Sequence, residues 1–268
     1  SIARVARQAM FPTQNLGDPF SQHRDSEAIA IIDHSDPGKP VPLEYSSLDS
    51  AANRYAQKLA ELKLATGSSV AIVGLNSSQY FAAYLGVMRA GCVAVPINVH
   101  SPADVIKFIF SDAEVRAAFV DFDLRHLVLE EIESVVLEAP DVFTDEPGVD
   151  FDIYLPDDRE TAEILYTSGS TGRPKGVVLS HRSQLLMLSA MGNTGRRPPF
   201  KSRTGVVAAP LFHMNALIFA TAILSHGGTV ALMRRFESSV FIDALVKCRA
   251  ELITGVPTII VMLYQHLR

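Results

Sequence analysis

The sequence of 268 residues contains no tryptophan and only two cysteines, Cys92 and Cys248. Neither a C-x-x-C nor an H-x-x-x-H spacing occurs, so the residues do not indicate a zinc-type metal site. The two cysteines lie far apart in apolar surroundings. This pattern predicts buried, reduced thiols of a cytoplasmic protein.

The sequence also lacks long apolar runs and any excess of basic residues. No run approaches the roughly 18 residues of a membrane-spanning helix, and the first residues do not resemble a signal peptide. The net charge is −5 at pH 7, which does not favour binding to nucleic acid. The densest basic run, Arg196–Arg203, is expected to be a solvated loop. We therefore expect small-molecule partners, no nucleic acid and no membrane span.

Short apolar runs alternate with segments of helical spacing. The runs at Val70–Leu75 and Val93–Val99 predict buried strands on either side of a helix over Gln79–Ala90, which Asn76 and Ser77 could cap. Other expected strands are Ala117–Asp121, Val206–Pro210, Thr229–Met233 and Leu252–Thr254, and other expected helices cover 48–62, Ala216–Leu224, Ser238–Arg249 and Pro257–Leu267, with one more starting at Ser101-Pro102. The alternation predicts an α/β protein with helices packed on mainly parallel sheets.

The segment Ile164–Arg182 reads ILYTSGSTGRPKGVVLSHR and places ten residues rich in Thr, Ser and Gly after an apolar run. Glycine lets the backbone turn tightly and approach a ligand, while hydroxyl groups donate hydrogen bonds without adding charge. Lys175 adds one positive charge, and successive N–H groups in such a turn can bind an anion. The composition favours a polyphosphate site. A flexible surface loop of small residues is the plainer alternative.

The spacing of this segment excludes three common glycine motifs. Pro174 precedes Lys175 and Gly176 follows it, so the Gly-Lys-[Ser/Thr] order of the P-loop is not met. The dinucleotide pattern G-x-G-x-x-G is missing. Ser170 directly follows Gly169, which excludes the hydrolase pattern G-x-S-x-G.

The segment TSGSTGRPKG resembles the phosphate-binding signature of the adenylate-forming, or AMP-binding, enzymes, which include acyl-CoA synthetases, firefly luciferase and the adenylation domains of peptide synthetases. Four other segments resemble the same family, in its order: YSSLDSAANRYAQKL, VAIVGLNSSQYFAAYLGVMRAGCVAVPINV, AAPLFHMNAL and LITGVPTII. The second contains the pattern LG-x-x-[KR]-AG-x-x-x-VP-x-N. Because the PLFH segment suits acyl and aryl CoA ligases best, the chain most resembles an acyl-CoA synthetase.

The resemblance implies only the N-terminal portion of such an enzyme, since members of the family are about twice as long. The later motifs, the hinge and the small C-terminal lid domain with its catalytic lysine have no counterpart here. Residues 1–268 would form a partial AMP-binding domain with two α/β subdomains. One, at about 66–200, would carry the phosphate loop, and the other would combine about 1–65 with 201–268. By itself this portion is expected to be inactive in the full reaction.

The resemblance implies that the protein activates a carboxylic acid with ATP, forms acyl-AMP, releases pyrophosphate and transfers the acyl group to CoA. The implied phosphate-binding residues are Thr167, Ser168, Gly169, Ser170, Thr171, Gly172 and Lys175. Lys175 would also act as a catalytic group by neutralising the departing pyrophosphate, because such catalysis is mainly positioning and electrostatic stabilisation.

The resemblance also places His213 beside the acyl pocket and the nucleotide, as a catalytic and substrate-binding residue; a structural histidine is the alternative. Phe212, Met214 and Asn215 would shape the same pocket. Mg²⁺ is expected with ATP, but its carboxylate ligand belongs to the later motif. No metal ligand is therefore predicted in this chain.

Three alternatives stay open. An adenylating enzyme that loads a carrier protein would share these motifs, and a downstream carrier domain would favour it. A truncated, non-catalytic homologue could bind only nucleotide or a partner. A phosphotransferase is disfavoured by the wrong Gly-Lys-[Ser/Thr] order.

Overall fold

The computed structural model describes residues 13–137, 150–167, 173–192, 200–255 and 257–266. The chain divides into two compact units. Unit 1 covers residues 1–19, 49–75 and 79–186, and unit 2 covers residues 20–48, 76–78 and 187–268. These units place residues 49–65 in unit 1, whereas the expected division joins residues 1–65 with 201–268. The expected division at about residues 66 and 200 stays a prediction about the family's subdomains.

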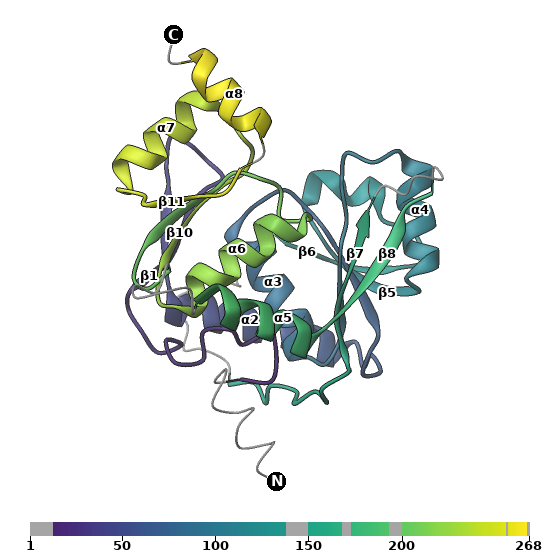
Figure 1. Ribbon diagram of the computed structural model, residues 1–268. Helices are drawn as coiled ribbons and strands as arrows, with labels where there is room; N and C mark the ends of the chain where they lie inside the picture. The colour runs from purple at the N-terminus through teal and green to yellow at the C-terminus, as the bar shows by residue number, and fades with distance from the viewer. Residues whose placement is uncertain (1–12, 138–149, 168–172, 193–199, 256, 267–268) are drawn as a thin grey trace. The chain divides into compact units, whose positions relative to one another are not determined.

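Unit 1 contains a six-stranded sheet in the order β6-β5-β3-β4-β7-β8 (Figure 1). Its strands are β3 (Ser69–Val73), β4 (Val93–Pro96), β5 (Val115–Val120), β6 (Glu133–Val136), β7 (Thr161–Thr167) and β8 (Lys175–Ser180). All neighbouring strands pair in parallel except β7 and β8, which are antiparallel. Every residue of β3 and β4 is buried, as expected for parallel strands covered on both faces.

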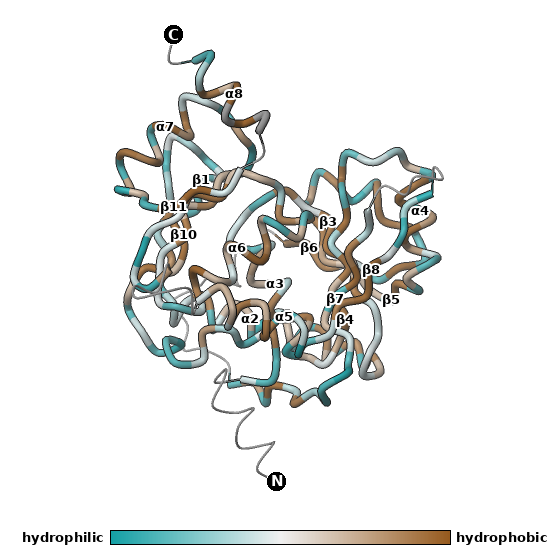
Figure 2. Tube along the Cα trace, viewed as in Figure 1, coloured by the Kyte–Doolittle hydropathy of each residue, from teal (hydrophilic) through white to brown (hydrophobic). Residues whose placement is uncertain are grey.

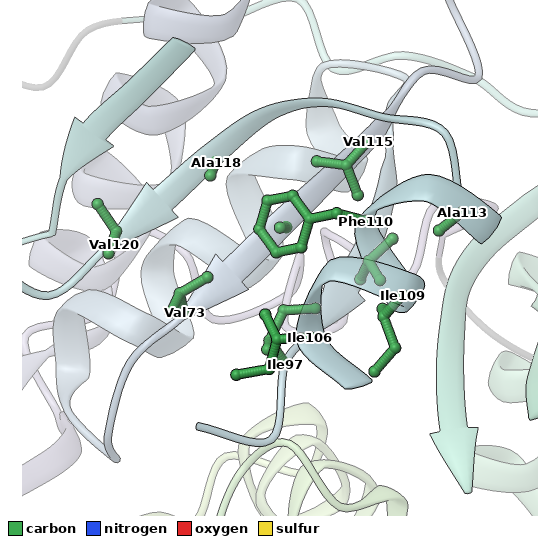
Figure 3. Close-up of a cluster of buried hydrophobic side chains, with 11 residues drawn as sticks. Val73, Ile97, Ile106, Ile109, Phe110, Ala113, Val115, Ala118 and Val120 are labelled. Carbon is green, nitrogen blue, oxygen red and sulfur yellow. The ribbon is translucent and has the colours of Figure 1, made fainter. Parts of the chain in front are cut away.

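Helices cover both faces of this sheet. The helices are α2 (Tyr45–Glu61), α3 (Ser78–Arg89), α4 (Ala103–Asp112) and α5 (His181–Gly192), with a 3-10 helix η1 at Phe122–Leu127. Figure 3 shows Phe110 and Ile106 of α4 among side chains such as Val73 of β3 and Val115 of β5. On β5, Phe119 alternates with these positions, and its ring packs edge-on against Tyr55 of α2, with centroids 4.9 Å apart. Successive side chains of β5 therefore point to opposite faces of the sheet and pack against different helices.

The family-like pattern LG-x-x-[KR]-AG has a packing explanation in unit 1. Arg89 is completely buried and makes an ion pair of 2.8 Å with Asp49 of α2. Its guanidinium also donates to the oxygen of Gly17, at 2.7 Å, and to Oδ1 of Asn53, at 2.6 Å. At Gly86 an added Cβ would lie 2.7 Å from the Ala52 oxygen, so glycine lets α2 and α3 approach closely. The pattern is structural here.

Unit 2 contains a five-stranded sheet in the order β11-β9-β10-β1-β2. Its elements are β1 (Ile29–His34), β2 (Val41–Glu44), β9 (Thr204–Val207), β10 (Thr229–Met233), β11 (Leu252–Ile253), α6 (Met214–Ser225), α7 (Ser238–Lys247) and α8 (Pro257–His266). Only β1 and β2 pair antiparallel. Val206 packs in a cluster with Phe241 of α7, whereas a Cβ at the adjacent Gly205 would meet Ile223 of α6. Helices α6 and α7 thus cover opposite faces.

The expected α/β class with mainly parallel sheets is confirmed. Figure 2 shows hydrophobic residues concentrated along the central strands of each sheet. Strands β1, β2 and β6 and helix α5 were not expected from the sequence. Two details were wrong. Cys248 is only partly buried, unlike Cys92. The helix expected to start at Ser101-Pro102 begins at Ala103, and Pro102 is its N-cap. No helix in the described part of the chain is long and apolar enough to cross a membrane.

Candidate functional site

Strands β7 and β8 form an antiparallel pair that flanks the Thr-, Ser- and Gly-rich segment. The register runs from Thr161 opposite Ser180 to Thr167 opposite Lys175. The structure therefore brings together the two ends of the predicted phosphate loop, Thr167 and Lys175, on neighbouring strands. The other predicted residues of this loop, Ser168, Gly169, Ser170, Thr171 and Gly172, lie outside the described residues.

Both Thr167 and Lys175 are exposed. Across the described ranges, the ammonium of Lys175 makes no ion pair with an acidic side chain. A hydroxyl and an unpaired cation at the same end of a hairpin can bind an anion, because the hydroxyl donates a hydrogen bond and the ammonium supplies charge.

The second predicted group of residues lies at the start of α6 in unit 2. His213 is the N-cap residue of this helix, with φ −101° and ψ 133°. The rings of Phe212 and His213 are tilted against each other, with centroids 4.6 Å apart. Phe212 is buried, whereas His213, Met214 and Asn215 are exposed. All four predicted pocket residues thus belong to one turn of chain.

The electrostatics of this turn favour a neutral histidine. Desolvation by the surrounding protein lowers the pKa of His213 below its usual value. The N-terminal end of the 12-residue helix α6 also carries partial positive charge, which disfavours a second positive charge on the imidazole. A neutral imidazole can both donate and accept hydrogen bonds. His213 is therefore suited to contact a polar or anionic group.

Comparison with known protein families identifies the family of this chain. The family model of AMP-binding enzymes matches residues 20–268, nearly the whole chain. The protein belongs to the AMP-binding enzyme family.

Similar proteins in this AMP-binding family include acid ligases of known activity. The chain is 31% identical over 219 residues to a medium/long-chain-fatty-acid–CoA ligase of Mycobacterium tuberculosis, FadD6, with 78% of this chain and 36% of FadD6 covered. It is also 31% identical to ScoC of Streptomyces coeruleorubidus, a fatty acid–[acyl-carrier-protein] ligase, with 76% of this chain and 41% of ScoC covered.

The solved structure of ATP-bound MatB from Rhodopseudomonas palustris matches with a TM-score of 0.78 and 26% identity. It covers 94% of this chain and 51% of the MatB chain. The chain thus spans about half, or less, of the length of these three proteins. Its mixed α/β fold, with two sheets of mostly parallel strands, is that of the N-terminal domains of adenylate-forming enzymes.

The segment that leads into the His213 turn of this AMP-binding protein is held by Asn76, which the sequence analysis expected to cap a helix. Its Nδ2 donates to the oxygens of Ala209 and Met233, at 2.9 and 3.0 Å. Its Oδ1 accepts from the Leu211 N–H at 2.7 Å. Asn76 therefore ties the connection between β9 and α6 to the end of β10.

Within unit 2, Asp33 of β1 instead makes hydrogen bonds with Ser78. Its Oδ2 accepts hydrogen bonds of 2.6 Å from both the backbone N–H and the hydroxyl of Ser78, the first residue of α3. The expectation that Asn76 caps the helix was wrong, because both polar atoms of its side chain bond elsewhere. The expectation for Ser77 stays a prediction. A carboxylate at a helix N-terminus is also favoured by the helix dipole.

A buried acid in β7 was missed by the sequence analysis. Glu163 lies four residues before Thr167, is 2% exposed and accepts a hydrogen bond from the Tyr84 hydroxyl. Burial raises the pKa of its carboxyl group to about 7. The signal in the sequence was a glutamate inside the apolar run AEILY.

The described residues contain no group of three or more His, Cys, Asp or Glu side chains placed to hold a metal ion.

Proposed function

We propose that this AMP-binding enzyme is an AMP-forming acid–CoA ligase, which activates a carboxylic acid with ATP and transfers the acyl group to CoA. The observation that carries the proposal is the register of β7 and β8, in which the exposed Thr167 and Lys175 of TSGSTGRPKG lie opposite each other. The family supports acid-ligase chemistry with ATP and CoA.

In the first step, a carboxylate oxygen of the acid attacks the α-phosphorus of ATP. The bond to the β-phosphate breaks, pyrophosphate leaves with its electron pair, and acyl-AMP forms. Lys175 stabilises the negative charge on the departing pyrophosphate, and Thr167 donates a hydrogen bond to a phosphate oxygen. The roles proposed for residues 168–172 rest on the sequence alone.

In the second step, the thiolate of CoA attacks the acyl carbonyl and AMP leaves. We assign His213 to the acid and nucleotide, with Phe212, Met214 and Asn215 shaping the pocket. The neutral imidazole can hydrogen-bond to a carboxylate or phosphate oxygen without competing with Lys175 for charge. Mg²⁺, when bound with ATP, would supply charge neutralisation at the phosphates; no step is assigned to it here.

A second acceptor is favoured by one specific similarity. ScoC, which is 31% identical to this chain, is a fatty acid–[acyl-carrier-protein] ligase. The adenylation step would be the same, and only the thiol that receives the acyl group would differ. The cytoplasmic location and the inactivity of these 268 residues alone stay predictions.

The test is product analysis with the complete native protein. Short-chain, long-chain, aromatic and amino acids are each incubated with ATP, Mg²⁺ and either CoA or a phosphopantetheinylated carrier protein. The proposal expects AMP, pyrophosphate and an acyl-CoA thioester with one class of acid. Thioester only on the carrier would favour the second acceptor. Absence of AMP with every acid, in folded protein, would contradict both.

A further inference from the structure

Helix α4 contacts both strands of the hairpin in unit 1. The Tyr166 hydroxyl, on β7, donates a hydrogen bond of 2.6 Å to Oδ2 of Asp112. The Arg173 guanidinium, just before β8, lies 5.7 Å from the centroid of the Phe108 ring, within the range of a cation–π contact. Phe108 and Asp112 are four residues apart, so one face of α4 makes both contacts.

The residues that make the two contacts are close in sequence to the candidate phosphate-binding residues. Tyr166 directly precedes Thr167, and Arg173 lies two residues before Lys175. Each contact therefore holds a side chain within two residues of Thr167 or Lys175.

The lack of a side chain at Gly176 leaves room for the Tyr166 ring. The two residues are directly opposite each other in the β7–β8 register. A Cβ at Gly176 would lie 3.1 Å from Cζ of Tyr166 and 3.0 Å from Cγ2 of Ile164, which is tighter than ordinary van der Waals contact. The glycine of the sequence PKG thus lets an aromatic ring cross β8, a recognised pairing in antiparallel sheets.

The position of Asp112 is unfavourable for the helix alone. It is the last residue of α4, where a negative charge opposes the helix dipole. Its hydrogen bond with Tyr166 offsets that cost. Burial and the Asp112 carboxylate raise the pKa of Tyr166 well above its usual value, so the phenol stays protonated and keeps donating at physiological pH.

We propose that Tyr166 and Asp112 are positioning residues, whose hydrogen bond to α4 sets the place of Thr167 and Lys175 for the polyphosphate of ATP. The Phe108–Arg173 contact supports the second strand in the same way. This inference rests on the proposed function, because it concerns the same nucleotide site.

The test compares variants in acid-dependent exchange of labelled pyrophosphate into ATP by the complete native protein. Tyr166→Phe and Asp112→Ala are expected to raise KM for ATP about three- to tenfold, with kcat changed less than twofold, since each removes one charge-assisted hydrogen bond. Asp112→Asn keeps an acceptor oxygen and is expected to restore part of the affinity. The double variant Tyr166→Phe/Asp112→Ala is expected to be no worse than the poorer single one.

A matched control exists in the same unit. The Tyr154 hydroxyl donates to Oε2 of Glu160 at 2.9 Å, outside the hairpin, so Tyr154→Phe removes a similar tyrosine–carboxylate bond. Its KM for ATP is expected to match the wild type. An equal rise in Tyr154→Phe would overturn the proposal by showing a general effect on unit 1.

Amide hydrogen exchange measures the anchoring directly. Tyr166→Phe is expected to speed exchange several-fold in residues 175–178, and Tyr154→Phe is not. An active wild type together with an unchanged KM in Tyr166→Phe would overturn the positioning role, whether or not amide exchange becomes faster. A wild type without acid-dependent pyrophosphate exchange would instead contradict the proposed function itself.

Discussion

The Tyr84 hydroxyl on α3 lies 3.0 Å from Oε2 of Glu163 on β7 and donates a hydrogen bond to it inside unit 1. Burial raises the pKa of this carboxyl from its usual value of 4.5 to about 7, and the Tyr84 hydrogen bond opposes part of the shift. The pKa of Tyr80, on the same helix, is raised by burial and also by the same carboxylate. An ionisable group is therefore held inside the sheet that carries the hairpin.

This arrangement predicts that stability falls as pH rises through the window from about 4.5 to about 7. The folded state binds a proton at Glu163 in this window and the unfolded chain does not, so raising the pH favours unfolding by on the order of 3 kcal/mol. Glu163→Gln keeps an acceptor for Tyr84 and removes the titration. Urea unfolding at pH 5, 6, 7 and 8 is expected to show a flatter pH dependence for Glu163→Gln, and an identical dependence would contradict the assignment.

Arg89→Met is expected to destabilise unit 1 by about 3–5 kcal/mol, because it removes a fully buried cation and leaves the carboxylate of Asp49, whose side chain is 16% exposed, without its partner. The measurement is urea unfolding at neutral pH. Arg116→Ala is the control, since Arg116 forms an exposed ion pair with Glu114 and such pairs contribute at most about 1 kcal/mol. Equal losses of unfolding free energy in the two variants would show that the Arg89 network stabilises unit 1 no more than an exposed ion pair does.

Asn76→Ala is expected to destabilise unit 2 by about 2–4 kcal/mol. It removes the hydrogen-bond partner of the Leu211 N–H and of the oxygens of Ala209 and Met233. It is also expected to raise KM for the acid, since this segment leads to His213. The control is Asn98→Ala, which loses one exposed bond to the His100 N–H. A destabilised Asn76→Ala with an unchanged acid KM would separate this segment from the acid site.

Local pattern was enough to predict the α/β class. Buried runs such as Val70–Leu75 and the helix over Gln79–Ala90 are visible in the sequence, because their spacing depends only on near neighbours. Strand β1, with the run IAIIDH, was not expected, and it pairs with β10, about 200 residues away. The antiparallel register of β7 and β8 was also unforeseen, although the apolar run before the Gly-rich segment was noted.

The supporting residues of the site were the least predictable from sequence. Asn76 and Asp33 both carry side chains typical of helix caps, and only the fold decides which one accepts the hydrogen bond of the Ser78 N–H. The partners of Asn76 lie 133 to 157 residues away. The role of Gly176 beside Tyr166 likewise depends on strand register. Such roles come from long-range pairing, which a single sequence does not contain.

The most direct measurement is acid-dependent exchange of labelled pyrophosphate into ATP by the complete native protein, comparing the wild type with Lys175→Ala. The account predicts exchange by the wild type with one class of acid and a loss of at least tenfold in Lys175→Ala, because the cation facing pyrophosphate is removed. Lys107→Ala, which removes an exposed lysine of α4 in the same unit, is expected to retain the rate. Undiminished exchange in folded Lys175→Ala would contradict the assignment of this hairpin to the polyphosphate.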